Sequence, residues 1–107
     1  MRRGDIMAVA IKGDYGKPRP ALILQSDLFD QHPSVTILPI TSEIRDTLLF
    51  RYNVYQDDHN GLITPSQVMI DKITTIKADK MGNPIGHLSS RQMSEITRLV
   101  ALWLGIA

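Results

Sequence analysis

The hydrophobic pattern of this chain changes its period near residue 89, and that change limits the folds open to it. Before it, apolar residues come in short runs separated by glycine, proline and polar clusters, which is typical of β-strands. After it, the apolar residues share one helical stripe: Met93, Ile96, Val100 and Trp103. Many short strands followed by one helix predict a mainly β (α+β) fold, a small, strongly twisted antiparallel sheet or half-open barrel closed by a C-terminal helix.

The predicted helix carries signals at both ends. Ser89 and Gln92 have the spacing of a capping box, and Gly105 is a typical helix stop. Arg91 and Arg98, with a glutamate between them, form the opposite and polar face. We therefore expect an amphipathic helix that packs its apolar stripe on the sheet.

The strand candidates are short apolar runs at residues 4–11, 21–25, 35–40, 50–55, 68–70 and 73–76. The first is apolar on both faces, which predicts burial on both sides. Pro39 indicates the end of its strand or a sheet edge. Residues 62–63 begin another extended segment that Pro65 interrupts.

Between these runs lie the predicted connections. Residues 26–34 are polar and fit a connection with one helical turn, and residues 41–47 form a polar loop. The Asn-Gly pair that ends residues 56–61 is a turn signal, and residues 81–84 form the last turn cluster.

Composition narrows the class of protein. The chain has 107 residues, of which 43% are hydrophobic and 21% charged, so we expect one domain spanning residues 1–107. Twelve basic against eleven acidic residues give a net charge of +1, so any nucleic-acid site must be a local patch. The chain has no cysteine, hence no disulfide and no thiolate metal site. No signal peptide or membrane span is recognisable, and a cytoplasmic location is expected.

One stretch, Gly16-Lys17-Pro18-Arg19-Pro20, leads directly into the second strand run. The two prolines stiffen the backbone on either side of Arg19. A guanidinium held at the rim of a sheet can grip phosphate with its planar fork of donors. A surface ion pair is the plainer alternative for this arginine.

Together with Arg3-Gly4-Asp5-Ile6, Leu38-Pro39-Ile40-Thr41-Ser42 and the segment from Gly61 to Ile73, this stretch resembles the MazF/PemK toxins of type II toxin–antitoxin modules. The match runs in register from residue 3 to about residue 104. The resemblance implies a homodimer with an SH3-like barrel plus helices. It also implies an endoribonuclease that cuts single-stranded RNA at short sequences without a metal or other cofactor, leaving a cyclic phosphate and a 5′-hydroxyl. A cognate antitoxin with an extended, acidic tail would block the site.

The resemblance assigns catalytic roles to Arg19, Thr41 and Ser42, which match the family's arginine and the threonine after its third strand. Arg19 would stabilise charge on the reacting phosphate, and the two hydroxyls would donate hydrogen bonds to phosphate oxygens. For Thr41 and Ser42 the structural alternative is a cap at the end of a strand.

Four further residues are assigned to substrate binding: Asp14, Tyr15, Lys17 and Gln67. Tyr15 would stack on a base, Gln67 matches the family's glutamine, and Asp14 is the acid nearest to Arg19. A solvated loop charge is the alternative for Lys17, and an ordinary strand hydrogen bond is that for Gln67.

The general base stays unassigned at this point. Many family members have an acidic residue directly before the glutamine, where this chain has Ser66, and the usual glycine-glutamate pair of the first loop is missing. Nothing in the sequence pairs two histidines, and His59 lacks any metal-ligand spacing, so no metal site is expected.

An alternative resemblance involves the last residues. The ending Trp103-Leu104-Gly105-Ile106 is similar to the end of CcdB, a toxin of the same fold class that poisons DNA gyrase. On that hypothesis the protein would bind gyrase without catalysis. For Trp103 itself, core or dimer packing is the alternative, since it lies on the apolar stripe of the helix. A third possibility is a catalytically inactive relative that only binds nucleic acid or an antitoxin.

Overall fold

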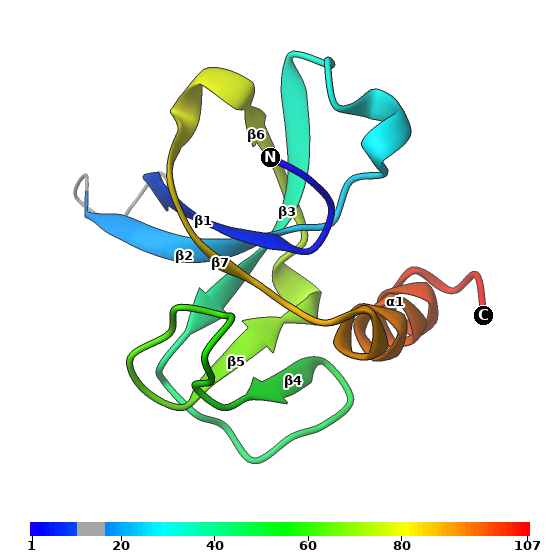
Figure 1. Cartoon of the computed structure of the whole chain (residues 1–107). Coiled ribbons are helices and arrows are strands. Elements are labelled where there is room, and N and C mark those ends of the chain that lie inside the picture. Colours follow the sequence, from blue (N-terminus) through cyan, green and yellow to red (C-terminus); the bar gives the residue numbers. More distant parts are fainter. Residues whose placement is uncertain (11–16) are drawn as a thin grey trace.

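The computed structural model describes residues 1–10 and 17–107, and Figure 1 shows a strongly curved sheet with one helix against it. The strands of this part of the chain are β1 Asp5–Ala10, β2 Pro18–Ile23, β3 Ser34–Thr41, β4 Arg51–Val54, β5 Ser66–Met69, β6 Thr74–Lys77 and β7 Met81–His87. Three short 3-10 turns, η1 Asp27–Phe29, η2 Ile70–Lys72 and η3 Ala78–Lys80, precede the helix α1 Ser90–Leu104. The prediction of a mainly β fold with a C-terminal helix is confirmed.

The described strands pair antiparallel in the order β4-β5-β3-β2-β1-β7, and β6 also pairs with β3. Strand β3 is the axis of this arrangement, as Figure 1 shows, because it runs through both halves of the sheet. Its first half pairs with β6, from Ser34 opposite Lys77 to Ile37 opposite Thr74. Its end pairs with β5, where Thr41 lies opposite Gln67.

Pro39 lies inside β3 and not at its end, which corrects the first of its two predicted placements. On one side it pairs with Ala21 of β2. On the other side it falls between the segment that pairs with β6 and the segment that pairs with β5. A residue without a backbone donor is tolerated there because no ladder bond is lost on that side.

Two apolar cores lie on opposite faces of β1, β2 and β3. Ile6 and Leu22 belong to the larger core, which also contains Ile96 and Val100 of α1. Their chain neighbours Met7 and Ala21 belong to the smaller one. Because side chains alternate along a strand, the predicted two-sided burial of the first strand is confirmed for these positions.

The helix ends are as predicted. Ser89 accepts from the Gln92 backbone and Gln92 bonds back to the Ser89 backbone, which completes a capping box. Gly105 adopts the left-handed conformation with φ 76° and closes the helix. Trp103 is half exposed, and its ring contacts that of Phe50 at a centroid distance of 6.3 Å.

The prediction of a turn at residues 81–84 is wrong, because this segment is the first part of β7. It pairs with β1, with Pro84 opposite Met7 and Met81 opposite Val9. A Cβ added to Gly82 would lie 2.7 Å from the Ala8 carbonyl oxygen, so the glycine permits the close approach of the two strands. Since β7 is the outer strand on its side of β1, its proline is also tolerated.

Three other strand predictions differ from the structure by more than one residue. Strand β2 begins at Pro18 and not at Ala21, because residues 18–20 pair with β1 beyond the end of the β3 pairing. Residues 62–63 form no strand. The strand predicted at 68–70 starts earlier, at Ser66, and ends at Met69.

Candidate active site

A cleft of about 700 Å³ opens where β2, the end of β3 and the segments around residues 62–66 and 72–74 meet. Its polar lining comes from residues far apart in the sequence: Arg19, Thr41, Ser42, Glu43, Thr64, Ser66, Lys72 and Thr74. Its apolar lining includes Pro20, Pro39, Ile40, Leu62 and Ile63. The cleft therefore joins a polar wall to an apolar wall that could contact bases.

Arg19 projects from β2 at the rim of this cleft. Strand β2 holds it by the pairing of Arg19 with Val9 of β1, and prolines flank it on both sides. Because proline fixes φ, the backbone from which the guanidinium extends has little freedom. The side chain is exposed, so its fork of donors can reach a ligand in the cleft.

Thr41 is the last residue of β3, and Ser42 begins the loop of residues 42–47, called here the cleft loop. The Glu43 backbone N–H donates to the Thr41 hydroxyl oxygen at 3.0 Å. The predicted strand cap is thus present, but it uses only the acceptor side of the hydroxyl. Among the described residues, no protein atom accepts the Thr41 hydroxyl hydrogen, which leaves that hydrogen for a ligand oxygen in the cleft.

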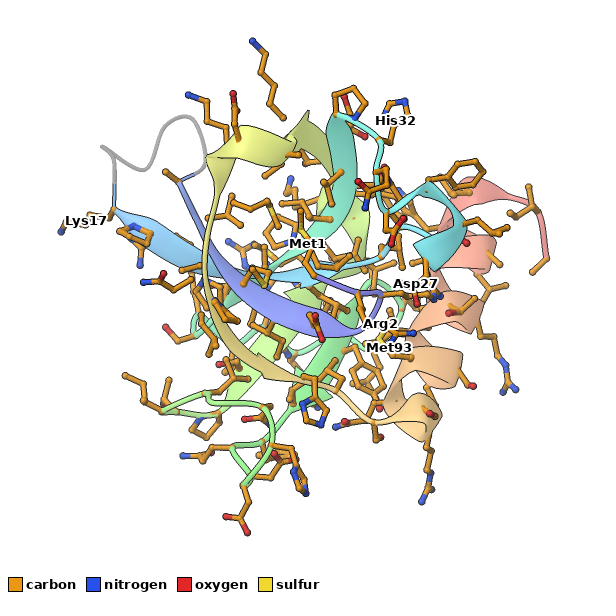
Figure 2. All side chains as sticks on the ribbon, turned by 45° about the horizontal axis from the view of Figure 1, so that its top comes forward. Met1, Arg2, Lys17, Asp27, His32 and Met93 are labelled. Carbon is orange, nitrogen blue, oxygen red and sulfur yellow. The ribbon has the colours of Figure 1, made fainter. Side chains whose placement is uncertain are left out.

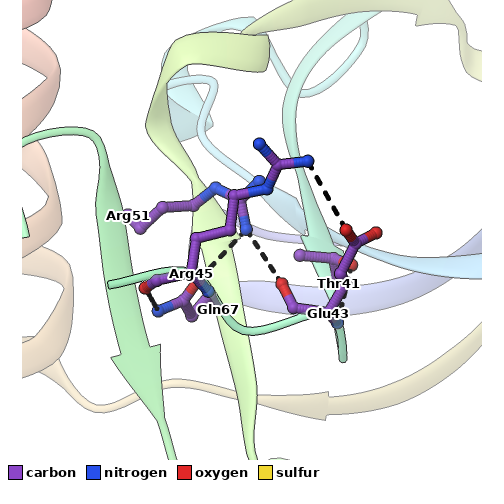
Figure 3. Close-up of polar contacts among 5 residues, drawn as sticks. All are labelled: Thr41, Glu43, Arg45, Arg51 and Gln67. Carbon is purple, nitrogen blue, oxygen red and sulfur yellow. Dashed lines mark hydrogen bonds and ion pairs between the residues drawn. The ribbon is translucent and has the colours of Figure 1, made fainter. Parts of the chain in front are cut away.

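Gln67 lies behind the cleft loop, at 1% exposure, and its amide is fully used inside the protein (Figure 3). Its Nε2 donates to the Arg45 carbonyl at 2.9 Å and to Asn53 Oδ1 at 2.8 Å. Its Oε1 accepts from the Arg45 backbone N–H at 3.1 Å and from Arg51 Nη1 at 3.0 Å. Gln67 therefore fixes the middle of the cleft loop, because it bonds both the backbone N–H and the backbone carbonyl of Arg45.

Arg51 supplies the second anchor of the cleft loop. Its Nη1 also donates to the Glu43 carbonyl at 3.1 Å, as Figure 3 shows. The side chain is buried at 7% exposure, and among the described residues no carboxylate lies within ion-pair distance. Its Nε is buried without a hydrogen-bond partner in the same part of the chain. A buried, uncompensated positive charge directly behind the cleft favours anions on the cleft side.

The structure brings together the three predicted catalytic residues, since Arg19, Thr41 and Ser42 all line the cleft. Lys17 is exposed one residue before β2 and is not part of the lining; Figure 2 shows it extending outward at the edge of the molecule. Contact of Gln67 with substrate stays a prediction, and the structure shows it as a buried anchor. The predicted Asp14 and Tyr15 lie outside the described residues.

Two charged residues of the cleft were missed by sequence reasoning. Lys72, in η2, adds a second cation, and its Nζ lies 3.8 Å from Asp71 Oδ2. Glu43 adds a carboxylate. Neither has a local sequence signal of function; Glu43 could have been noticed only because it follows the Thr41-Ser42 pair directly.

Two cations, hydroxyl donors and a buried guanidinium behind them give one side of the cleft the groups that could bind an anion, beside an apolar wall. The fold and the site thus define a small antiparallel β protein with a cleft suited to a phosphate backbone and its bases. The family of PemK-like, MazF-like toxins of type II toxin–antitoxin systems matches residues 2–104 of the chain. The chain belongs to this family.

Individual relatives agree with this membership. The chain is 43% identical, over 100% of its length and 99% of the relative's, to the probable endoribonuclease MazF of Mycolicibacterium smegmatis. Its structure resembles that of the Mycobacterium tuberculosis toxin MazF-mt6 with a TM-score of 0.82 and 30% identity, covering 96% of this chain and 98% of the other. A mycobacterial endoribonuclease in complex with its cognate antitoxin has the same fold, with a TM-score of 0.83 at 23% identity and coverage of 100% and 97%.

These matches do not favour the gyrase-poison alternative, which rested on the CcdB-like ending. Part of that ending packs within the chain, since Trp103 contacts Phe50. Leu104 and Ile106, which follow it, are by contrast more than half exposed. Within residues 1–10 and 17–107, no helix is long and apolar enough to cross a membrane.

Proposed function

We propose that this protein is the toxin of a type II toxin–antitoxin module and acts as an endoribonuclease on single-stranded RNA. The observation that carries the proposal is the convergence of Arg19, Thr41 and Ser42 on one cleft with an apolar wall. The reaction is attack of a ribose 2′-hydroxyl on the adjacent phosphate, which gives a 2′,3′-cyclic phosphate and a 5′-hydroxyl. The names of the relatives, which are endoribonucleases, support the same activity.

In this proposal each residue of the polar wall has one task. Negative charge grows on the non-bridging phosphate oxygens as the 2′-oxygen approaches phosphorus. Arg19 balances that charge with two parallel donors, and the Thr41 hydroxyl donates its hydrogen to the same oxygens. Ser42, which is exposed and lines the cleft beside Thr41, adds a further donor. Lys72 binds a neighbouring phosphate and fixes the strand along the cleft.

RNA must be single-stranded for this cleft because its bases have to leave the helix to be read. The apolar wall of Leu62 and Ile63 would contact such bases. Ile63 is 93% exposed, and burying an apolar side chain under a base lowers the free energy of the complex. A duplex would keep its bases stacked inside and present only phosphates to the wall. The proposed reaction uses protein cations at the phosphate and requires no metal ion, as the family resemblance implies.

The proposed partners are a cognate antitoxin and a second copy of the chain. An acidic, extended antitoxin segment could place carboxylates on Arg19 and Lys72 and so exclude RNA. For the homodimer, the end of α1 keeps Leu102, Trp103 and Leu104 about half exposed. Equilibrium sedimentation checks the dimer, and a monomer at all concentrations would contradict it.

The first test is cleavage of an end-labelled, unstructured RNA in excess EDTA by wild type and Arg19→Ala. We expect discrete cuts by wild type and a loss of about 10³-fold in the variant, since one preorganised donor at the oxyanion supplies that order of effect. Arg98→Ala, which removes an exposed arginine from α1, is the matched control and should cut normally. Intact RNA with wild type across varied sequences, or normal cutting by Arg19→Ala, would contradict the proposal.

A further inference from the structure

The cleft contains a carboxylate to which nothing so far assigns a role. Among the described lining residues, Glu43 is the only one with a carboxylate or an imidazole. The proposed RNA cleavage requires a base for the 2′-hydroxyl. Arginine is a reluctant base because its guanidinium stays charged. Resting on that proposed function, we propose that Glu43 is the general base of the reaction.

The backbone of Glu43 is fixed from both ends. Its N–H donates to the Thr41 hydroxyl oxygen at 3.0 Å, and its carbonyl accepts from buried Arg51 at 3.1 Å (Figure 3). The first bond ties Glu43 to the hydroxyl that faces the phosphate. The backbone that carries the base and the phosphate donor is therefore held in one three-residue turn before substrate arrives.

One cation contacts this carboxylate, and three others line the same cleft or lie behind it. Arg45 Nη2, from the cleft loop itself, lies 3.4 Å from Glu43 Oε1. Arg19 of β2 and Lys72 of η2 line the same cleft, and Arg51 of β4 lies behind the Glu43 carbonyl. A carboxylate has two oxygens, so one can stay with Arg45 while the other accepts a proton. Arg45 then restrains the side chain without occupying all of it.

The Glu43 carboxylate takes the proton of the 2′-hydroxyl as the 2′-oxygen forms its bond to phosphorus. The bond between phosphorus and the 5′-oxygen breaks, and the leaving 5′-oxygen takes a proton from water at the open side of the cleft. Arg19 and the Thr41 hydroxyl hold the non-bridging oxygens throughout, and the Glu43 proton passes to solvent afterwards.

The test compares Glu43→Gln with Asp46→Asn in the RNA cleavage assay. Both changes remove one negative charge from the cleft loop, but Asp46 is not part of the cleft lining. Gln keeps the length of the side chain and both backbone bonds. We expect Glu43→Gln to lower kcat by about 10²- to 10⁴-fold with little change in KM, and Asp46→Asn to match wild type.

The pH profile separates a base from a residue that only binds. Wild-type activity should fall toward acid pH as the carboxylate gains a proton, and this fall should disappear in Glu43→Gln. Asp14→Asn, the other acid that the sequence places near Arg19, is measured in parallel. If the acid-side fall persists in Glu43→Gln and disappears in Asp14→Asn, the proposal is overturned.

A substrate with sulfur in place of the bridging 5′-oxygen separates a base from an acid. Sulfur leaves without protonation, so loss of a general acid would be rescued on this substrate, whereas loss of a general base would not. We expect Glu43→Gln to be slow on both substrates, and rescue would overturn the assignment. If wild type cuts while Glu43→Gln cuts equally fast, only this inference fails; if wild type cuts no RNA, the proposed function fails first.

Discussion

Each of the two walls of the cleft is attached to the fold by its own buried amide side chain, and the two attachments differ. The part of the polar wall at residues 41–43 is held by Gln67, which reaches the backbone of Arg45 across 22 positions of the sequence. The apolar wall at Leu62 and Ile63 follows a turn held by Asn60, which is fully buried and whose side chain, among the described residues, bonds only to residues between 55 and 62. Its Nδ2 donates to the Tyr55 carbonyl at 2.9 Å, and its Oδ1 accepts from the Leu62 N–H at 3.0 Å.

The difference shows which loop depends on the rest of the fold. The turn of residues 56–61 contains most of its own hydrogen bonds: Asp57 Oδ1 accepts from the His59 and Asn60 backbones at 2.8 Å each. These two bonds hold the pKa of the Asp57 carboxyl below its usual value. The cleft loop has fewer internal bonds and takes its shape from strands β4 and β5. The polar wall should therefore respond to changes in the sheet, whereas the apolar wall should respond to changes in its turn.

The largest effect is expected from Gln67→Ala. It removes four hydrogen bonds and leaves buried Arg51 with the Glu43 carbonyl as its one remaining hydrogen-bond partner among the described residues, which should cost about 3 kcal/mol of unfolding free energy. In protein that stays folded, kcat should fall by about 10²-fold because Thr41 and Glu43 lose their support. Urea unfolding and steady-state kinetics measure both; an unchanged kcat would show that the cleft loop keeps its shape without Gln67.

A smaller and different effect is expected from Asn60→Ala, the matched change on the other wall. The loss of its bonds should cost about 2 kcal/mol. In the proposed reaction the apolar wall contacts bases in the ground state and the transition state alike, so KM should rise by about 3- to 10-fold while kcat stays close to wild type. The same kinetic assay decides the matter: a fall in kcat like that of Gln67→Ala would mean that the walls do not act separately.

The smallest effect is expected from Tyr52→Phe, which changes neither wall. The Tyr52 hydroxyl donates to Glu95 of α1, and burial, followed by this bond and the charge of Glu95, raises the pKa of Tyr52 from 10 to about 12. The folded protein thus holds the phenol proton more tightly than the unfolded chain. The stability from this group is complete below pH 10 and is lost as the pH rises from 10 to 12.

Because the Tyr52 side chain is partly exposed, solvent screening limits this contribution to about 1 kcal/mol. The unfolding free energy of wild type should fall by that amount between pH 10 and 12. The unfolding free energy of Tyr52→Phe should be lower by the same amount below pH 10 and should show no such fall. Thermal unfolding followed across that pH range measures the difference, and kcat and KM at neutral pH should equal those of wild type. Equal pH dependence in the two proteins would contradict the assignment.

Part of this structure could be foreseen because its signals are local. The capping box of Ser89 and Gln92 and the helix stop at Gly105 depend on neighbouring residues only, and they were predicted correctly. The turn before Gly61 was predicted from its Asn-Gly pair, and Gly61 has a φ of 69°. Local signals failed at Gly82 and Pro84, since the same residues that mark turns also permit the close approach of β7 to β1.

The residues of the candidate site also fall into two groups, those that the sequence could identify and those that it could not. Arg19, Thr41 and Ser42 could be named from the sequence because each lies in a recognisable motif at the end of an apolar run. Lys72 and Glu43 could not, because their place in the cleft depends on how β2, β3 and η2 come together. Gln67 could be named as important, but its task could not be seen, because burial and four bonds are properties of the assembled fold.

Most of the strands, the C-terminal helix with its limits and the rigid Arg19 segment follow from the sequence, since alternation, capping and proline geometry act within a few residues. The cleft, the buried guanidinium behind it and the position of Glu43 follow only from the tertiary structure. Their physical cause is that β3 ends beside β5, so Thr41 meets Gln67 and the cleft loop must bond to groups that the chain supplies later. A buried polar group must find a partner wherever the fold offers one, and sequence distance does not limit that choice.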